Sequence, residues 1–244
     1  MILGGACDFD CKAANDLMIQ IPDGFYRPLF PERDPDLKEE IPALPVPVSS
    51  FLLDKFPVTV SEYIDFLSIN KKWRKSIIPS IYADSLYLNN WEFDLEPGDL
   101  VNKKSPVTYV SWFSAKAYCA WKGKRLPTIA EWEYAASETP IEKILKWYSK
   151  PASEILPDVG LTFKNKFGTF DLHGIIWEWV LDFNSDLINE ESRNGTEIER
   201  SMFCGGSSAG SSRPEDYAAF MRLAFRSSLN AKYTVSNLGF RCAK

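Results

Sequence analysis

Thiols are the side chains of this sequence best suited to redox chemistry or to binding a soft metal. The five cysteines are Cys7, Cys11, Cys119, Cys204 and Cys242. Five is an odd number, so at least one thiol lies outside any intramolecular disulfide. The Cys7-x-x-x-Cys11 spacing permits a thiolate pair for Cu(I), which prefers soft ligands. Two other interpretations stay open for these thiols: an incidental pair in a frayed tail, and a lipid anchor.

The residues before Cys7 favour the lipid anchor in one respect. Leu3-Gly4-Gly5-Ala6-Cys7 is similar to the end of a lipoprotein signal, in which a small residue precedes the lipidated Cys. The stretch is too short for a full signal peptide, and no Lys or Arg precedes its apolar residues. We therefore treat residues 1–17 as a tail, with lipidation of Cys7 as one interpretation.

The chain contains a single histidine, His173. It is suited to proton transfer near neutral pH, or it fixes the loop before a buried strand. One histidine excludes a His-rich metal centre. It also disfavours the common non-haem iron site, which uses two histidines and a carboxylate.

Composition narrows the class of protein. The 244 residues carry 33 acidic and 28 basic side chains, a net charge of −5. Nucleic-acid binding requires a basic face, so it is not expected. The 34 aromatic residues, which are 8 Trp, 10 Tyr and 16 Phe, exclude a disordered chain. No apolar run approaches the roughly 20 residues of a membrane span.

Capping residues predict three short helices that position these side chains. A helix N-terminus often carries Ser or Thr, followed three residues later by Glu. The helices are expected at about 60–70 (Thr59 with Glu62), from Ser111 to Gly123, and from Thr128 with Glu131 to Ala136. Strands are expected at 18–26, 48–56, 106–110 and within 166–181. The rest, including 31–47, 71–104, 137–160, 184–200 and most of 202–242, is expected to be irregular.

Several motifs occur together in one order. They are VTYVSWFSAKAYCAWKGKRLPTIAEWEYAA (107–136), FGTFDLHGIIWEWVLDF (167–183), FCGGSS (203–208) and SNLGFRCA (236–243). In this order they resemble the formylglycine-generating enzyme family, also called the sulfatase-modifying-factor domain, over about residues 18–243. The resemblance implies one α+β domain over 18–244, related to C-type lectins and poor in regular secondary structure. WFSAKAYCAW and DYAAFMRLAFRSSL are most similar to NirV-like nitrite-reductase accessory members, which are bacterial envelope proteins.

The resemblance implies a copper site that this sequence lacks. Formylglycine-generating enzymes bind Cu(I) through two cysteines and use O2 to oxidise a substrate Cys. The matching positions here are Gly210 and Ala218, and residues 205–241 contain no Cys. Copper-dependent Cys oxidation is therefore not expected. Cys204 is the nearest thiol, either a redox or metal ligand or a buried small apolar group.

A pocket is still implied where copper and substrate lie in the family. Its candidate residues are Ser207, Ser208, Gly210, Asp216, Tyr217, Arg222 and Arg226. Arginine can bind a carboxylate at two points. The alternatives are that Arg226 is a buried structural arginine paired with a carboxylate, and that Tyr217 belongs to the core.

The resemblance also implies a calcium loop and a disulfide. Calcium would be held by side-chain oxygens of Asp171 and Glu178 and by the carbonyl groups of Gly174 and Ile176, because Ca2+ prefers oxygen ligands. The alternative is that Asp171 caps a turn and Glu178 pairs with an arginine. The disulfide would join Cys119 to Cys242, which implies an oxidising compartment such as the periplasm.

Three functions follow from these expectations. The first is an accessory or binding protein of the bacterial periplasm or envelope that recognises a protein or peptide partner and has lost the copper pair. The second is a metal-dependent oxidoreductase with altered chemistry in the same pocket. The third is a lectin-like ligand-binding protein, on fold analogy.

Overall fold

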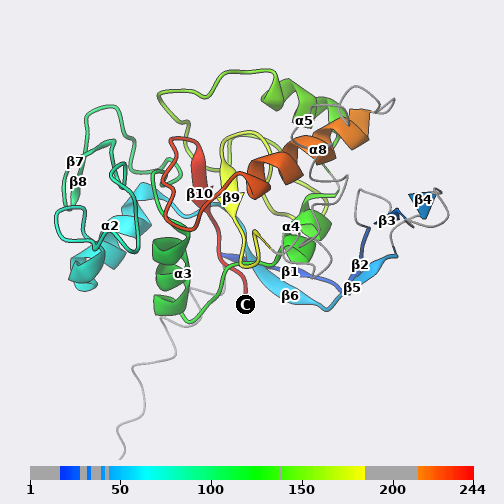
Figure 1. Ribbon diagram of the computed structural model, residues 1–244, viewed down its shortest axis with the longest axis horizontal. Helices are drawn as coiled ribbons and strands as arrows, with labels where there is room; N and C mark the ends of the chain where they lie inside the picture. The colour runs from blue at the N-terminus through cyan, green and yellow to red at the C-terminus, as the bar shows by residue number, and fades with distance from the viewer. Residues whose placement is uncertain (1–16, 28–31, 34–39, 42–43, 138, 185–213) are drawn as a thin grey trace, which may run out of the picture.

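The computed structural model describes residues 17–27, 32–33, 40–41, 44–137, 139–184 and 214–244 (Figure 1). Its helices are α2 (Val60–Ile69), α3 (Trp112–Trp121), α4 (Ile129–Ala136), α5 (Ile141–Tyr148), α8 (Pro214–Ser227) and the 3-10 turn η1 (Lys71–Trp73). Its strands are β1 (Met18–Ile21), β2 (Gly24–Tyr26), β3 (Glu32–Arg33), β4 (Glu40–Ile41), β5 (Val46–Val48), β6 (Phe51–Asp54), β7 (Trp91–Phe93), β8 (Glu96–Pro97), β9 (Trp177–Trp179) and β10 (Leu238–Phe240).

The three helices predicted from capping residues are confirmed. Thr59 with Glu62 and Thr128 with Glu131 form complete capping boxes at the starts of α2 and α4. The Ser111 side chain accepts a hydrogen bond from the Ser114 amide at the start of α3. Gly123 follows α3 with φ of 68°, a left-handed conformation that glycine adopts without a Cβ clash.

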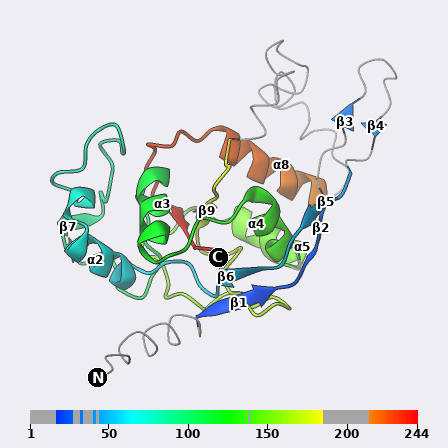
Figure 2. The same cartoon turned by 90° about the horizontal axis from the view of Figure 1, so that it is seen from below.

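The strands pair two by two in the described part of the chain. β1, β2, β3 and β7 pair antiparallel with β6, β5, β4 and β8, and β9 pairs parallel with β10. Gly239 in β10 is required by close approach, because a Cβ there would lie 2.3 Å from the Val107 carbonyl oxygen. The helices α3, α4 and α8 lie around β9 and β10, whereas β1, β2 and β5 lie along the edge of the molecule (Figure 2). The fold is thus a single α+β domain built on short strands, consistent with a C-type lectin-like fold.

Some predicted elements are wrong. Residues 137–160 contain α5, and 202–242 contain α8, although both stretches were expected to be irregular. Residues 106–110 form no strand: Pro106 makes an isolated bridge to Thr59. The strand expected over 48–56 is shorter, Phe51–Asp54, and Val48 belongs to β5. No helix among the described residues has the length and apolarity needed to cross a membrane.

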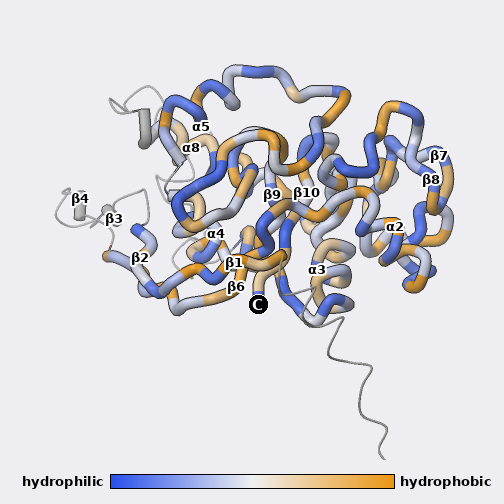
Figure 3. The backbone as a smooth tube through the Cα atoms, turned by 180° about the vertical axis from the view of Figure 1, so that it is seen from behind, coloured by the Kyte–Doolittle hydropathy of each residue, from blue (hydrophilic) through white to orange (hydrophobic). Residues whose placement is uncertain are grey.

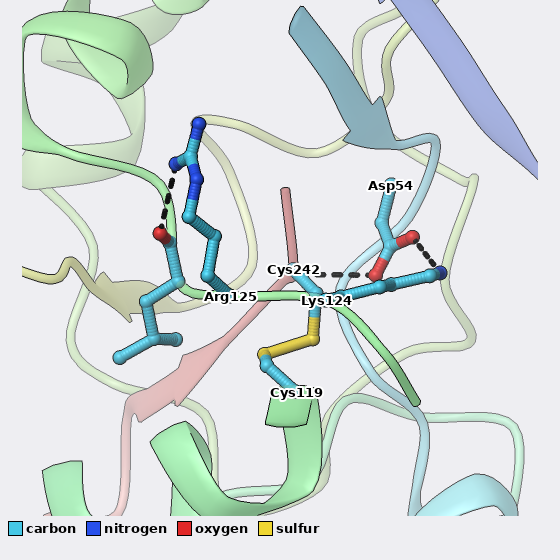
Figure 4. Close-up of a disulfide and its surroundings, with 6 residues drawn as sticks. Asp54, Cys119, Lys124, Arg125 and Cys242 are labelled. Carbon is cyan, nitrogen blue, oxygen red and sulfur yellow. Dashed lines mark hydrogen bonds and ion pairs between the residues drawn. A yellow bond between two sulfur atoms is a disulfide. The ribbon is translucent and has the colours of Figure 1, made fainter. Parts of the chain in front are cut away.

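A disulfide joins helix α3 to the segment after β10 (Figure 4). It links Cys119 to Cys242 with a Cα–Cα distance of 5.6 Å, the pairing that the resemblance implies, and both residues are fully buried. Beside it, the Asp54 carboxylate accepts from the Cys242 amide at 3.0 Å and pairs with Lys124 at 2.5 Å. The disulfide and the two contacts of Asp54 therefore fasten three segments that are far apart in the sequence.

Candidate functional site

Two arginines of α8 meet one glutamate of α4 inside the protein. Arg222 and Arg226 are four residues apart, so they share a helix face. The Glu133 carboxylate accepts from Arg222 Nε at 3.0 and 3.1 Å and from Arg226 Nη1 at 2.6 Å. All three side chains are buried. We call them the Glu133 cluster.

The charges in this cluster fix its ionisation. Burial alone would raise the pKa of Glu133, but the two arginines outweigh burial and lower that pKa to about 2. Burial opposes the charge on Arg222, yet Glu133 raises the pKa of this arginine above its ordinary value. The cluster therefore carries two guanidinium groups and one carboxylate, an excess of one positive charge near neutral pH.

Aromatic rings enclose the cluster. The Arg226 guanidinium lies 5.2 Å from the Trp132 ring centroid, a cation–π arrangement. Trp177 stacks on Phe225 of α8 at 4.5 Å and on Tyr148 of α5 at 5.2 Å. Burial raises the pKa of the Tyr148 hydroxyl to about 12, so this phenol stays neutral.

His173 lies beside the same cluster. Its ring centroid is 5.2 Å from that of Trp132. Burial lowers the pKa of His173 to about 3, and the charge of Arg222 acts in the same direction. Its Nδ1 atom is buried and has no hydrogen-bond partner in the described part of the protein. A histidine with this pKa is neutral at physiological pH, so it does not supply a proton there.

The pocket residues implied by the resemblance therefore have different surroundings in the structure. Arg222 and Arg226 come together, but both guanidinium groups are already paired with the Glu133 carboxylate. For Arg226 this is the alternative interpretation, a buried structural arginine paired with a carboxylate. Tyr217 is 39% exposed on α8, so the expectation that it belongs to the core is wrong. Ser207, Ser208 and Gly210 lie outside the described residues. Asp216 lies in α8, and its side chain is outside the description.

The loop expected to bind calcium uses its carboxylates in another way. Asp171 is fully buried in a left-handed conformation with φ of 61°. Its carboxylate accepts from the Gly160 amide at 2.5 Å, the Thr162 amide at 3.1 Å and the Thr162 hydroxyl at 2.5 Å. Asp171 thus closes a turn, as in the alternative interpretation.

The Glu178 carboxylate, like that of Asp171, accepts several hydrogen bonds from the protein. It accepts from Arg241 Nε and Nη2, both at 2.8 Å, and from Trp132 Nε1 at 2.7 Å. Both expected carboxylate ligands are therefore satisfied by protein donors. In the described part of the chain no group of three His, Cys, Asp or Glu side chains could hold a metal ion. Calcium bound by Asp171, Gly174, Ile176 and Glu178 would therefore have to share these carboxylates with their present hydrogen-bond donors.

The described part of the chain contains no free thiol. Both cysteines that the structure describes, Cys119 and Cys242, are consumed by the disulfide. Cys7, Cys11 and Cys204 lie outside the described residues. Ala218, one of the two positions matched to the copper ligands, is buried on α8, and its carbonyl oxygen accepts from Arg222 Nη1 at 3.2 Å.

Glu133 and its aromatic neighbours were not identified from the sequence. One indication was available, because Glu133 stands in α4 between Trp132 and two buried alanines, and an acidic residue on an apolar helix face requires a partner. The partner comes from α8, which the sequence pattern did not predict. The aromatic ring of Tyr148 comes from α5, which was missed for the same reason.

Together the fold and this site define a small α+β domain whose interior holds buried ion pairs where the resemblance implies a metal. The chain belongs to the sulfatase-modifying factor family, since the Sulfatase-modifying factor enzyme 1-like domain matches residues 6–244.

Its relatives include proteins named as active and as inactive enzymes. Inactive C-alpha-formylglycine-generating enzyme 2 of Bos taurus is 28% identical over 212 residues, which cover 67% of this chain and 69% of that protein. Formylglycine-generating enzyme of Mus musculus is 26% identical over 286 residues, with 93% and 74% covered. Among solved structures, PvdO from Pseudomonas aeruginosa shares the fold with a TM-score of 0.54, 18% identity and 93% of each chain covered.

Proposed function

We propose that this chain is a binding member of its family that does not oxidise cysteine. In this proposal it serves as an accessory protein of the bacterial envelope and recognises a protein or peptide partner, as the NirV-like resemblance suggests. The observation that carries the proposal is the absence of cysteine from residues 205–241. Cu(I) requires soft donors such as thiolates, and the matching positions are Gly210 and Ala218.

The surroundings of Ala218 support the loss of copper binding. The side chain at this position is a methyl group buried on α8, one helical turn before Arg222. A methyl group cannot replace a thiolate as a ligand. The family also contains relatives named as inactive formylglycine-generating enzymes.

The disulfide supports the proposed location. Disulfides persist in oxidising compartments such as the periplasm and are rare in the cytosol. The Cys119–Cys242 bond is fully buried and forms part of the core. A lipid anchor at Cys7 would hold such a protein at the envelope, and mass analysis of the natively expressed chain tests that part of the proposal.

The catalytic part is tested with copper, O2 and a sulfatase-type peptide that contains the substrate Cys. Two forms are assayed, the full chain and a form without residues 1–15, with formylglycine-generating enzyme of Streptomyces coelicolor as the positive control. We expect neither O2 consumption nor peptide oxidation by either form. Activity of both forms would overturn the proposal. Activity of the full chain alone would identify Cys7 and Cys11 as copper ligands.

A further inference from the structure

One end of the molecule carries many of the large hydrophobic side chains that are exposed in the described residues. α2, β7 and β8 lie together at one end of its long axis in two perpendicular views (Figures 1 and 2). Eight of the sixteen large hydrophobic side chains that are exposed in the described residues lie between 69 and 100. Hydrophilic and hydrophobic segments alternate along the tube at this end (Figure 3). Exposed apolar side chains gathered in one region indicate an interaction surface.

This surface contains a groove of about 980 Å3 between the turn at residues 74–76 and the β7–β8 hairpin. We call it the end groove. Phe93 and Leu95 of the hairpin contribute apolar lining and are 61% and 37% exposed. The hairpin has two strands, and no third strand pairs with it in the described part of the chain. The groove is therefore open to another molecule.

The two flanks of the end groove carry opposite charges. One flank follows α2 and carries Arg74, Lys75 and Lys103. Arg74 donates to carbonyl groups at the end of this helix, and the Lys103 carbonyl accepts from an amide at its start, so the basic residues are spread along α2. The other flank is the hairpin, with three carboxylates, which belong to Glu92, Asp94 and Glu96.

Several of these charges are unneutralised. Glu92, Glu96 and Lys103 are exposed and make no ion pair with another described residue. Lys75 instead donates to the Trp91 carbonyl at 2.5 Å, and Asp94 accepts from the Ser76 amide at 2.8 Å. These two bonds hold the flanks at a fixed separation. A partner of a single charge sign would be attracted by one flank and repelled by the other.

A surface with one basic and one acidic flank is complementary to itself. In a two-fold symmetric dimer the same patch faces its own copy, and residue i contacts residue j on both sides of the axis. A rotation of 180° about an axis through the groove sets the basic flank of one chain against the acidic flank of the other. Phe93 and Leu95, which lie on the acidic flank, are then buried against the basic flank of the other chain, and buried aromatic residues contribute strongly to association.

We infer that the end groove is the interface of a symmetric homodimer of this chain. The inference is independent of the proposed function. It is tested by sedimentation equilibrium and light scattering on the full chain over a range of concentrations. The expected mass rises from the 27.8 kDa of one chain to twice that value. A constant mass of one chain at all concentrations would overturn the inference and leave the groove to a different partner, such as a peptide or a lipid surface.

Charge reversal gives the sharper experiment. One variant carries Arg74→Glu and Lys103→Glu, and the other carries Glu92→Lys and Glu96→Lys. In a homodimer of either variant, like charges face each other, so the dissociation constant of the dimer should rise at least about 30-fold. An equimolar mixture pairs an all-acidic with an all-basic groove and should restore the dimer.

Matched controls reverse two charges at exposed positions on and after α5. They are Lys146→Glu with Lys150→Glu, and Glu142→Lys with Glu154→Lys, and both should dimerise like the unmodified chain. Because Arg74 also bonds to the end of α2, Lys103→Glu alone replaces the first variant if circular dichroism shows misfolding. A mixture that stays monomeric, or dimers that the groove variants do not weaken, would contradict the inference.

Discussion

Arg241 and Glu178 form a salt bridge in which neither side chain has any exposure to solvent. The guanidinium donates to both carboxylate oxygens at 2.8 Å. Its remaining hydrogens reach backbone carbonyl groups of Asp54, at 3.1 Å, and Phe170, at 2.8 Å. Arg241 follows β10 and Glu178 lies in β9, so the pair joins these parallel strands to the end of strand β6 and to the loop that contains Phe170. This pairing engages the carboxylate that the resemblance assigns to calcium.

Removing one member of this pair should be far more harmful than removing both. Arg241→Met leaves a buried carboxylate without its partner, and we expect a loss of about 3–5 kcal/mol in the free energy of unfolding. Arg241→Met with Glu178→Leu removes both charges and should recover a large part of that loss. Urea denaturation of the three proteins measures the difference. Equal free energies of unfolding for the single and double variants would show that the cost does not come from leaving the Glu178 carboxylate unpaired.

The Asp171 loop should stabilise the protein without calcium. Asp171→Ala removes a carboxylate that accepts three hydrogen bonds, which we expect to cost about 3 kcal/mol. Asp171→Asn is the control, because asparagine tolerates the left-handed conformation and keeps one acceptor oxygen. Melting temperatures in Ca2+ and in EDTA should be equal for all three proteins. A rise with Ca2+ that Asp171→Ala abolishes would restore the calcium site.

His173 should make the protein sensitive to mild acid. Its pKa is about 3 in the folded protein and 6.5 ordinarily, so the unfolded chain binds a proton first as the pH falls. The stability from a neutral His173 is therefore complete above pH 6.5 and is lost progressively toward pH 3. Between pH 7 and 5 we expect a decrease of about 2 kcal/mol.

The same measurement on His173→Gln identifies the source, because the chain has no other histidine. Urea denaturation at each pH should give a variant whose stability changes much less between pH 7 and 5. Glu133 adds a second loss below its ordinary pKa of 4.5, since its pKa is about 2 in the folded protein. Identical pH profiles for the two proteins above pH 5 would refute the assignment to His173.

The disulfide should supply a large share of the stability. Its cysteines are 123 residues apart, and chain entropy assigns about 5 kcal/mol to closing a loop of this length. Cys119→Ala with Cys242→Ala should lower the melting temperature as much as full reduction does. Calorimetry with and without reductant checks this, and peptide mapping that finds both thiols free in exported protein would contradict it.

Local chemistry in the sequence predicted the helices that carry their own caps. Thr59, Ser111 and Thr128 each satisfy backbone amides within four residues, so α2, α3 and α4 could be located without knowledge of the fold. α5 begins after Pro140 with no side-chain cap, and it packs against α8 and, through Trp147 and Tyr148, against Trp177 of β9. The formation of α5 depends on a segment that is distant in the sequence, so the local residue pattern does not predict this helix.

The site was predictable to the same limited extent. The alternatives of a turn-closing Asp171, an arginine-paired Glu178 and a carboxylate-paired Arg226 were all visible in the sequence as residue types. Their partners, Thr162, Arg241 and Glu133, lie 9 to 93 positions away. Only the packing of α8 on α4 and of β10 on β9 decides between a metal ligand and an ion pair.

The segment after β10 gives this fold a particular order of assembly. Residues 242–244 bond to the edge of strand β6 that β1 leaves free, and also to Arg125. The Asp54 amide donates to the Cys242 carbonyl, Leu52 and Lys244 exchange two bonds, and so do Arg125 and Ala243. Until residues 242–244 have docked, β6 has β1 as a partner but lacks its second one. The core therefore closes late, through contacts of high sequence separation, which slows folding.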